Sequence, residues 1–98
     1  MRRVMVRYRV KPDRVDENES LVRAVYEELH RANPPGFRYA TFKLDDGVTF
    51  THIAMQTTDG PNPLSELEAF EQFQREIGDR CDVLPVVTDL TGIGSFGF

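Results

Sequence analysis

Three residues of this chain could carry out chemistry together, namely His52, Tyr8 and Tyr39. A histidine exchanges a proton near neutral pH, because its unperturbed pKa is about 6.5. A tyrosine hydroxyl both donates and accepts hydrogen bonds, so it can orient a substrate that carries an oxygen atom. The catalytic hypothesis from these residue types is that His52 acts as a general base and that Tyr8 or Tyr39 orients the substrate.

The alternative is a purely structural role for His52. In that case the buried ring forms a hydrogen bond with a tyrosine or a backbone group, and this bond only satisfies a buried polar side chain. Three phenylalanines bear on the choice. Phe50 shares the strand face of His52, and Phe70 and Phe73 have the spacing of a helix face. They are either core residues alone or the walls of a small apolar cavity with a few polar groups, which is the usual form of a small-molecule site.

The elements that position these residues are predicted from hydrophobic periodicity. Alternation with a period of two predicts strands, and apolar residues every three to four positions predict helices. The expected strands cover residues 3–10, 37–44 and 48–58 and a last segment from about 83 into "VVTDLTGIGSF", and the expected helices run from about 13–16 to 32 and from about 64 to 77.

Local signals predict the hairpin turn and the start of the first helix. Asp45, Asp46 and Gly47 predict a tight hairpin turn, since an Asp-Gly pair tolerates the positive φ angles that such a turn requires. Asp13 or Asp16 is the expected N-cap of the first helix.

The ends of the second helix have competing signals. Ser65 and Glu68 have the spacing of a capping box, whereas Asn62 followed by Pro63 predicts a start one turn earlier. Gly78 is the expected stop.

The order of elements is strand, helix, strand, hairpin, strand, helix, strand. It predicts an α+β fold of the ferredoxin-like split βαβ type, β-α-β-β-α-β, as a single domain over residues 1–98. This fold has a four-stranded antiparallel sheet with two helices on one face, and its first and third strands are central neighbours. Tyr8 and His52 are therefore expected to meet beneath the helices, beside Phe50 and Phe73. Pro85 restricts the last strand to the sheet edge or to a bulge.

The helix-free face of the predicted sheet carries apolar side chains. Met5, Phe42, Ile53 and Met55 have the parity of this face. An exposed apolar surface of that size is a liability, and a second copy could cover it through a two-fold contact. A homodimer is therefore expected, and folding back of the C-terminal tail over the same face is the alternative.

Composition excludes several classes of protein. Apolar residues make up 40% and charged residues 29%, which is typical of a soluble globular domain. The net charge of −4 argues against sequence-independent binding of nucleic acid, which requires a positive surface. No apolar run reaches the ~20 residues of a membrane helix, and arginines interrupt "MRRVMVRYRV", so that no signal peptide is predicted. A cytoplasmic location is expected.

Three further motifs give little support for a nucleotide site, a metal site or a cysteine nucleophile. Residues 92–97 spell GxGxxG, but only Phe98 follows, so the helix that a dinucleotide site requires is missing. His30 and His52 lie on different predicted elements, so no metal site is expected. A nucleophilic pair of Cys81 with either histidine is conceivable, but neighbouring acids make the thiol less reactive, and a small buried thiol is the preferred interpretation.

The layout resembles the dimeric α/β-barrel superfamily, and most of all its antibiotic-biosynthesis monooxygenase-like branch. The resemblance rests on the order of elements, on "GFRYATFKLDDGVTFTHIAMQ" and on "LSELEAFEQFQREI". It implies either a cofactor-independent oxygenase that oxidises a small aromatic compound or a relative without an assigned activity. Haem degradation is disfavoured, because the tryptophan, first-strand asparagine and second-helix histidine of such enzymes are missing.

Two functions from different classes remain open. In the first, the protein is a cofactor-independent oxygenase or isomerase that acts on a small aromatic or polyketide-like compound. In the second, it is a non-catalytic dimeric module that binds a small ligand or a protein. The missing tryptophan favours the second function, and the central histidine favours the first.

Overall fold

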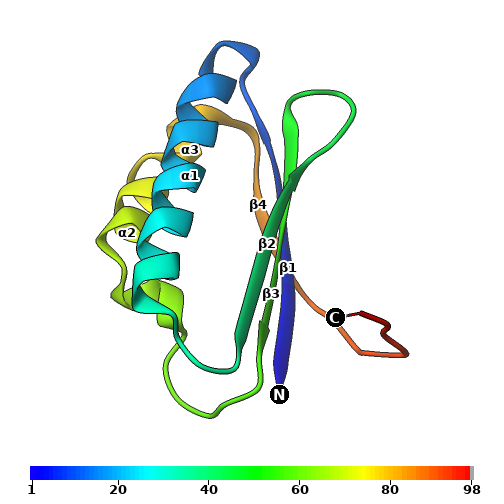
Figure 1. Cartoon of the computed structure of the whole chain (residues 1–98). Coiled ribbons are helices and arrows are strands. Elements are labelled where there is room, and N and C mark those ends of the chain that lie inside the picture. Colours follow the sequence, from blue (N-terminus) through cyan, green and yellow to red (C-terminus); the bar gives the residue numbers. More distant parts are fainter. Residues whose placement is uncertain (98) are drawn as a thin grey trace.

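The computed structural model describes residues 1–97 as a sheet with helices on one side (Figure 1). The strands are β1 (Arg2–Val10), β2 (Phe37–Lys43), β3 (Thr49–Gln56) and β4 (Cys81–Asp89). The helices are α1 (Val15–Ala32), α2 (Glu68–Arg75) and the short α3 (Ile77–Arg80), with 3-10 turns at Pro12–Arg14 and Pro63–Glu66. The strand order is β2-β3-β1-β4, and every pairing is antiparallel. The predicted α+β ferredoxin-like fold is confirmed.

Strand register places two of the three residues of the catalytic hypothesis, Tyr8 and His52, on the same face of the sheet. In the β1–β3 pair, Val6 lies opposite His52 and Tyr8 lies opposite Phe50. Residues opposite each other in an antiparallel pair point to the same face. Tyr8, Phe50 and His52 are all buried beneath the helices, as the alternation in the sequence predicts.

The core lies between the helices and this face of the sheet. Tyr8, Val10, Val25, Phe50 and Phe73 expose at most 5% of their surface. Each contributes an apolar side chain at the position where strand or helix periodicity directs it inward. The aromatic rings therefore form part of the core as well as part of any site built on it.

The expected N-cap of α1 is wrong. Arg14 occupies the capping position without a side-chain cap bond, and neither Asp13 nor Asp16 caps the helix. The chain instead enters α1 through the 3-10 turn that starts at Pro12, whose fixed φ suits a first helical position. Asp16 lies in the first turn, where a negative charge favours the helix dipole.

The second helical segment is not continuous from residue 64 to 77. Its earlier start is confirmed, because the Asn62 side chain accepts a hydrogen bond from the Leu64 amide. Leu67 then adopts an extended conformation, with φ −94° and ψ 128°, so the capping box of Ser65 with Glu68 is wrong. The break leaves Leu64 only 3% exposed, and its burial outweighs the local preference for a continuous helix.

The expected stop at Gly78 is also wrong, since Gly78 lies inside α3. The last strand begins at Cys81 and ends at Asp89, earlier at both ends than predicted. Beyond it, Leu90 makes one more backbone bond, to Arg3, and residues 90–97 form no strand or helix. The GxGxxG motif at residues 92–97 therefore lies in a segment without regular secondary structure.

Pro85 occupies the predicted setting, since β4 is an edge strand. The pairing of β4 with β1 shifts register between Arg7 and Arg9, opposite the segment from Val83 to Val86 that contains Pro85. A bulge at this place removes the need for a ladder donor that proline lacks.

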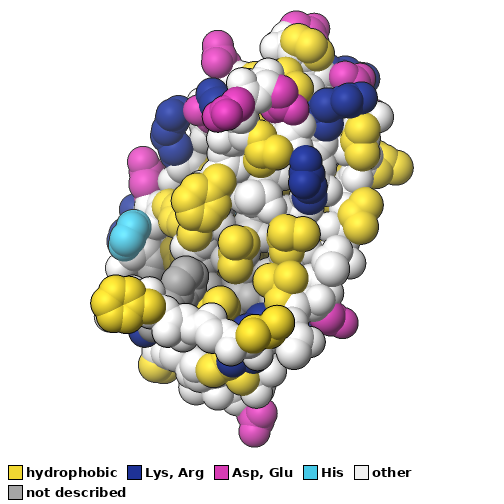
Figure 2. Space-filling view, turned by 90° about the vertical axis from the view of Figure 1, so that its right-hand side faces the viewer, with side chains coloured by type: hydrophobic (Ala, Val, Ile, Leu, Met, Phe, Trp, Pro, Cys, Tyr) yellow, Lys and Arg dark blue, Asp and Glu magenta, His cyan; other side chains and the backbone are white. Residues whose placement is uncertain are grey.

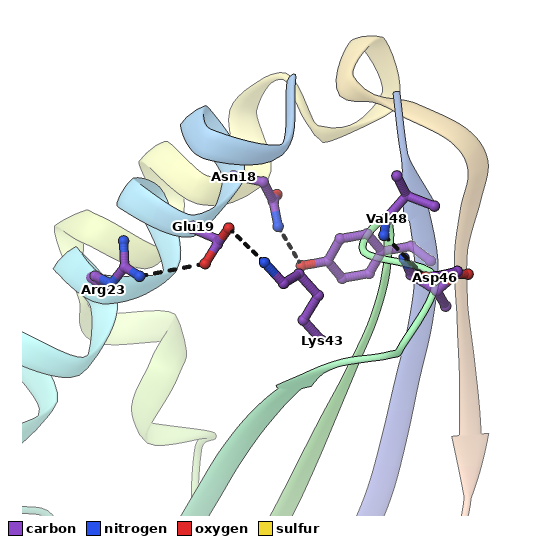
Figure 3. Close-up of polar contacts among 8 residues, drawn as sticks. Asn18, Glu19, Arg23, Lys43, Asp46 and Val48 are labelled. Atoms are coloured by element: carbon purple, nitrogen blue, oxygen red, sulfur yellow. Dashed lines mark hydrogen bonds and ion pairs between the residues drawn. The ribbon is translucent and has the colours of Figure 1, made fainter. Parts of the chain in front are cut away.

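The hairpin between β2 and β3 turns at the predicted residues. Gly47 has a φ of 76°, which is the positive value expected of glycine in such a turn. The Asp46 carboxylate accepts hydrogen bonds from the backbone amides of Val48 and Thr49 (Figure 3). These bonds hold the turn, and with it the register that brings β3 beside β2.

Candidate functional site

A cavity of about 500 Å³ lies between α2 and the helix-covered face of the sheet. Its walls combine apolar side chains with a few convergent polar groups. The lining residues include Tyr8, Tyr39, His52, Phe70, Phe73 and Gln74. The volume is within the range of about 300–1,000 Å³ typical of small-molecule sites.

His52 lies between two tyrosines in the wall of this cavity. Its Nε2 atom is 2.7 Å from the Tyr8 hydroxyl oxygen, and its Nδ1 atom is 2.5 Å from the Tyr39 hydroxyl oxygen. Thr41 Oγ1 is 3.1 Å from the same Nδ1 atom. Both nitrogens thus have side-chain partners, and since the residue is only 5% exposed, neither nitrogen faces bulk water. The expected meeting of Tyr8 and His52 is confirmed.

The chain of contacts continues at both ends of His52. On the Nε2 side, Asn18 Nδ2 donates to the Tyr8 hydroxyl oxygen at 3.0 Å, and Figure 3 shows the Asn18 side chain extending from α1 toward the sheet. Arg80 Nε in turn donates to Asn18 Oδ1 at 3.3 Å. A continuous buried network therefore runs from α3, through α1 and β1, to the ring on β3.

On the Nδ1 side the network ends near the surface. Thr41 Oγ1 is 2.7 Å from the hydroxyl oxygen of Tyr26, which is a partly buried residue of α1. The rings of Tyr26 and Tyr39 stack with their centroids 5.3 Å apart. Stacking fixes the plane of Tyr39, and with it the position at which its hydroxyl enters the cavity.

Burial sets the charge states in this site. It lowers the pKa of His52 to about 4, because the desolvated ring disfavours the imidazolium. Burial also raises the pKa of Tyr8 and of Tyr39 well above 10, because the charged phenolate is disfavoured in a desolvated site. At neutral pH the ring and both phenols are therefore uncharged. A neutral ring has one nitrogen that accepts and one that donates.

Phenylalanines frame the network but differ in their relation to the cavity. Phe70 and Phe73 line it, and the Phe73 ring centroid is 5.5 Å from that of His52. Phe50 stacks on Tyr8, with centroids 5.6 Å apart and planes inclined by 11°. Since Phe50 is not a lining residue, it supports Tyr8 from within the core and does not face a ligand.

Sequence reasoning missed Asn18 and Arg80, which are 0% and 1% exposed. Both occupy apolar stripes at helical spacing. Asn18 precedes Val22 and Val25 on α1, and Arg80 follows Phe73 and Ile77 at the same spacing. A polar residue on an apolar stripe was the available signal, since a buried polar group requires partners.

The other candidate groups lie outside this network. Cys81 is buried, and burial raises the pKa of its thiol, which disfavours a thiolate nucleophile. His30 is on the exposed side of α1. Within residues 1–97, no cluster of three or more histidine, cysteine, aspartate or glutamate side chains could hold a metal ion. No helix in the same range is long and apolar enough to cross a membrane.

No family model matches the sequence, and no curated protein matches it. Solved structures do match. A candidate antibiotic biosynthesis monooxygenase from Nitrosomonas europaea is 20% identical, with a TM-score of 0.76 over 96% of this chain and 100% of that one. Rv0793 from Mycobacterium tuberculosis is 16% identical, with a TM-score of 0.75 over 96% of each chain.

A third structure, described as an antibiotic biosynthesis monooxygenase, is 18% identical, with a TM-score of 0.71 over 96% of this chain and all of that one. At such identities the similarity establishes the fold. The expected resemblance is confirmed at that level: the chain has the ferredoxin-like fold of the antibiotic biosynthesis monooxygenase-like proteins.

Proposed function

We propose that this protein is a cofactor-independent oxygenase that acts on a small, flat aromatic compound with a hydroxyl group. The observation that carries the proposal is the position of His52, held between two phenols in the wall of an aromatic-lined cavity. The structural neighbours named as monooxygenases support the same reaction class.

The cavity suits a fused aromatic ring system. Phe70 and Phe73 offer ring faces or edges to an aromatic ligand, which such rings prefer to contact by offset stacking or edge-to-face. The polar groups lie together at the sheet side of the cavity, where Tyr8 and Tyr39 flank His52. A ligand with a single hydroxyl group directed at the sheet would therefore satisfy both parts of the wall.

The reaction that fits is oxidation of an electron-rich phenol by dioxygen. Removal of the hydroxyl proton makes the ring carbon opposite the hydroxyl reactive toward dioxygen. A carbon–oxygen bond forms there to give a hydroperoxide, whose O–O bond then breaks with loss of water. For 1-naphthol the products are 1,4-naphthoquinone and water, so one oxygen atom enters the product and dioxygen is the only oxidant.

His52 is the group that would take up the proton. Its pKa of about 4 keeps the ring neutral at pH 7, so one ring nitrogen has a lone pair that faces a tyrosine hydroxyl and can take up a proton passed on by it. Protonation of a buried ring is unfavourable by itself. When the proton comes from the ligand, however, the imidazolium and the ligand phenolate form together, and their attraction in a low-dielectric site opposes the desolvation penalty.

Oxygen uptake by purified protein with 1-naphthol tests the proposal. We expect uptake above the rate without protein, and labelled dioxygen should place one labelled atom in the quinone. His52→Ala should reduce the rate at least tenfold, whereas His30→Ala, a change at the other histidine of the chain, should not alter it. A 1-naphthol thermal shift without any oxygen uptake would instead support the non-catalytic binding module.

We also propose that a second copy of the chain covers the helix-free sheet face. The strand pairings put Met5, Ile53 and Met55 on this face with Phe42 and Val86, which are 54% and 59% exposed. Figure 2 shows hydrophobic side chains gathered across it, with charged groups most numerous at the top of the view and a basic side chain among the hydrophobic ones. A two-fold contact buries the same patch on both copies, so it would remove this apolar face from water.

A further inference from the structure

The buried network also contains a pair of residues that sets the direction of its hydrogen bonds. Arg80 has no carboxylate partner in any ion pair found among residues 1–97. Its guanidinium donates instead to Asn18 Oδ1, at 3.3 Å, and to the Phe73 carbonyl oxygen, at 2.7 Å. A guanidinium only donates, so the group that faces Arg80 Nε must be the oxygen of the Asn18 amide.

The orientation of Asn18 then determines the role of Tyr8. With its oxygen toward Arg80, the amide presents its NH₂ group to the Tyr8 hydroxyl oxygen, 3.0 Å away. The Tyr8 oxygen therefore accepts from Asn18, and its own hydrogen is left to be donated. The acceptor within reach is His52 Nε2, at 2.7 Å.

The role of Tyr8 in turn fixes the form of the histidine ring. If Nε2 accepts a hydrogen bond, the neutral ring must carry its hydrogen on Nδ1. That hydrogen is donated to the Tyr39 oxygen at 2.5 Å, with Thr41 Oγ1 at 3.1 Å as a second acceptor. Tyr39 thus accepts from the ring, and its hydroxyl hydrogen is available to Thr41 or to a ligand in the cavity.

We infer that Arg80 and Asn18 are positioning residues that give the network one direction. His52 carries its ring hydrogen on Nδ1, Tyr8 is the side at which a ligand hydroxyl loses its proton, and Tyr39 is the side that donates to a ligand oxygen. The proton moves from the ligand oxygen to the Tyr8 oxygen while the Tyr8 hydrogen moves to Nε2. Only the ligand part of this inference rests on the proposed function.

It follows that the site distinguishes two kinds of ligand oxygen. Near Tyr8 it takes a hydroxyl that can donate. Near Tyr39 it takes an oxygen that accepts, such as a carbonyl. An aromatic ketone should therefore bind better than the same ring system without oxygen, through the Tyr39 hydroxyl alone.

Nitrogen-15 NMR of the two histidine rings in the ligand-free protein tests the direction of the network. Protonated and unprotonated ring nitrogens resonate far apart, and His30→Gln assigns the signals of His52. We expect protonated Nδ1 and unprotonated Nε2 in the wild type at pH 7. A wild-type ring with its hydrogen on Nε2 would overturn the inference, whether or not any variant folds.

Asn18→Asp tests the positioning role. A carboxylate next to Arg80 cannot donate, so the Tyr8 hydroxyl should turn to it and the ring hydrogen of His52 should move to Nε2. Tyr26→Phe, which removes a hydroxyl at the other end of the network, should leave the hydrogen on Nδ1. If folded Asn18→Asp protein keeps the hydrogen on Nδ1, Asn18 does not set the direction.

Binding of 1-tetralone and of tetralin, measured by calorimetry, tests the ligand part separately. These molecules differ by one carbonyl oxygen. The ketone should bind the wild type about fivefold more tightly, as one net hydrogen bond allows, and Tyr39→Phe should remove the difference. Equal binding by the wild type would overturn the role of Tyr39. If neither compound binds, the proposed function loses its support while the NMR result still decides the direction of the network.

Discussion

His52 Nε2 lies 2.7 Å from the hydroxyl oxygen of Tyr8, a residue 44 positions earlier in the chain. The contact depends on the pairing of β1 with β3 at the centre of the sheet, which places the two residues on one face. It lies beneath α1 and beside Phe73, so it is shielded from water on the helix side. The stability of the protein and its proposed chemistry therefore depend on the same pair of side chains.

Replacement of Tyr8 by phenylalanine should destabilise the fold. The change keeps the ring that stacks on Phe50 but leaves His52 Nε2 and the Asn18 amide without the hydroxyl between them. We expect the free energy of unfolding to fall by about 1–3 kcal/mol, the range for buried groups that lose a partner. Urea denaturation measures it. Tyr26→Phe is the matched control, and an equal loss for both variants would contradict the importance of the buried hydroxyl.

Stability should depend on the protonation of His52 in acid. Burial lowers the pKa of His52 to about 4 in the folded protein, whereas the unfolded chain binds the same proton near pH 6.5. Between these values the unfolded state holds more protons, so stability is full above pH 6.5 and is lost as the pH falls toward 4. The loss is about 3 kcal/mol for this shift.

Denaturation midpoints of the wild type and His52→Gln, measured from pH 7 to pH 4, isolate that contribution. The glutamine variant should be less stable at pH 7 and should lose less stability on acidification. Because the carboxylates of both proteins titrate alike, the difference between the two curves belongs to His52. If the midpoints of both proteins fell by the same amount with pH, the pKa of His52 would not be lowered in the folded protein.

The turn between β2 and β3 should be sensitive at Gly47. Its φ of 76° disfavours a β-branched side chain, although a Cβ atom there would meet nothing within 4 Å. Gly47→Val should therefore reduce the free energy of unfolding by about 1–2 kcal/mol through backbone strain alone. Gly94→Val is the control, since that position is equally open and lacks a positive φ. Equal midpoints for the two variants would contradict a strained turn.

The helix-free sheet face should hold two copies together. Light scattering at micromolar concentration should give about twice the chain mass of 11.2 kDa. Phe42→Lys, which puts a charge on the apolar face at its β2 edge, should shift the protein toward the monomer. Gln72→Lys adds the same charge on the exposed side of α2 and should leave the dimer intact. A wild-type monomer would contradict the proposal.

The sequence predicted the features that depend on local periodicity. Alternation in β1 and β3 placed Tyr8 and His52 on the covered face, and the Asp-Gly pair located the hairpin. The break at Leu67 was missed, because it accompanies long-range contacts: Leu64 is buried in the core, and the Ala69 amide at the start of α2 donates to the Glu28 carboxylate.

The sequence could not give the partners of the network. The contact between Asn18 and Arg80 joins positions 62 residues apart, and it depends on how α3 packs against α1. Each residue alone was visible only as a polar side chain on an apolar stripe. That pattern shows that a buried polar group needs a partner, but it does not identify which one.

Calorimetric titration of 1-naphthol into the wild type, His52→Ala and His30→Ala tests most directly whether the cavity at His52 is a site for an aromatic hydroxyl compound. The account predicts one binding site per chain, equal affinity for the wild type and His30→Ala, and affinity about tenfold weaker for His52→Ala, which is a difference of about 1.4 kcal/mol. Equal affinity in all three proteins, or no binding by the wild type, would contradict it.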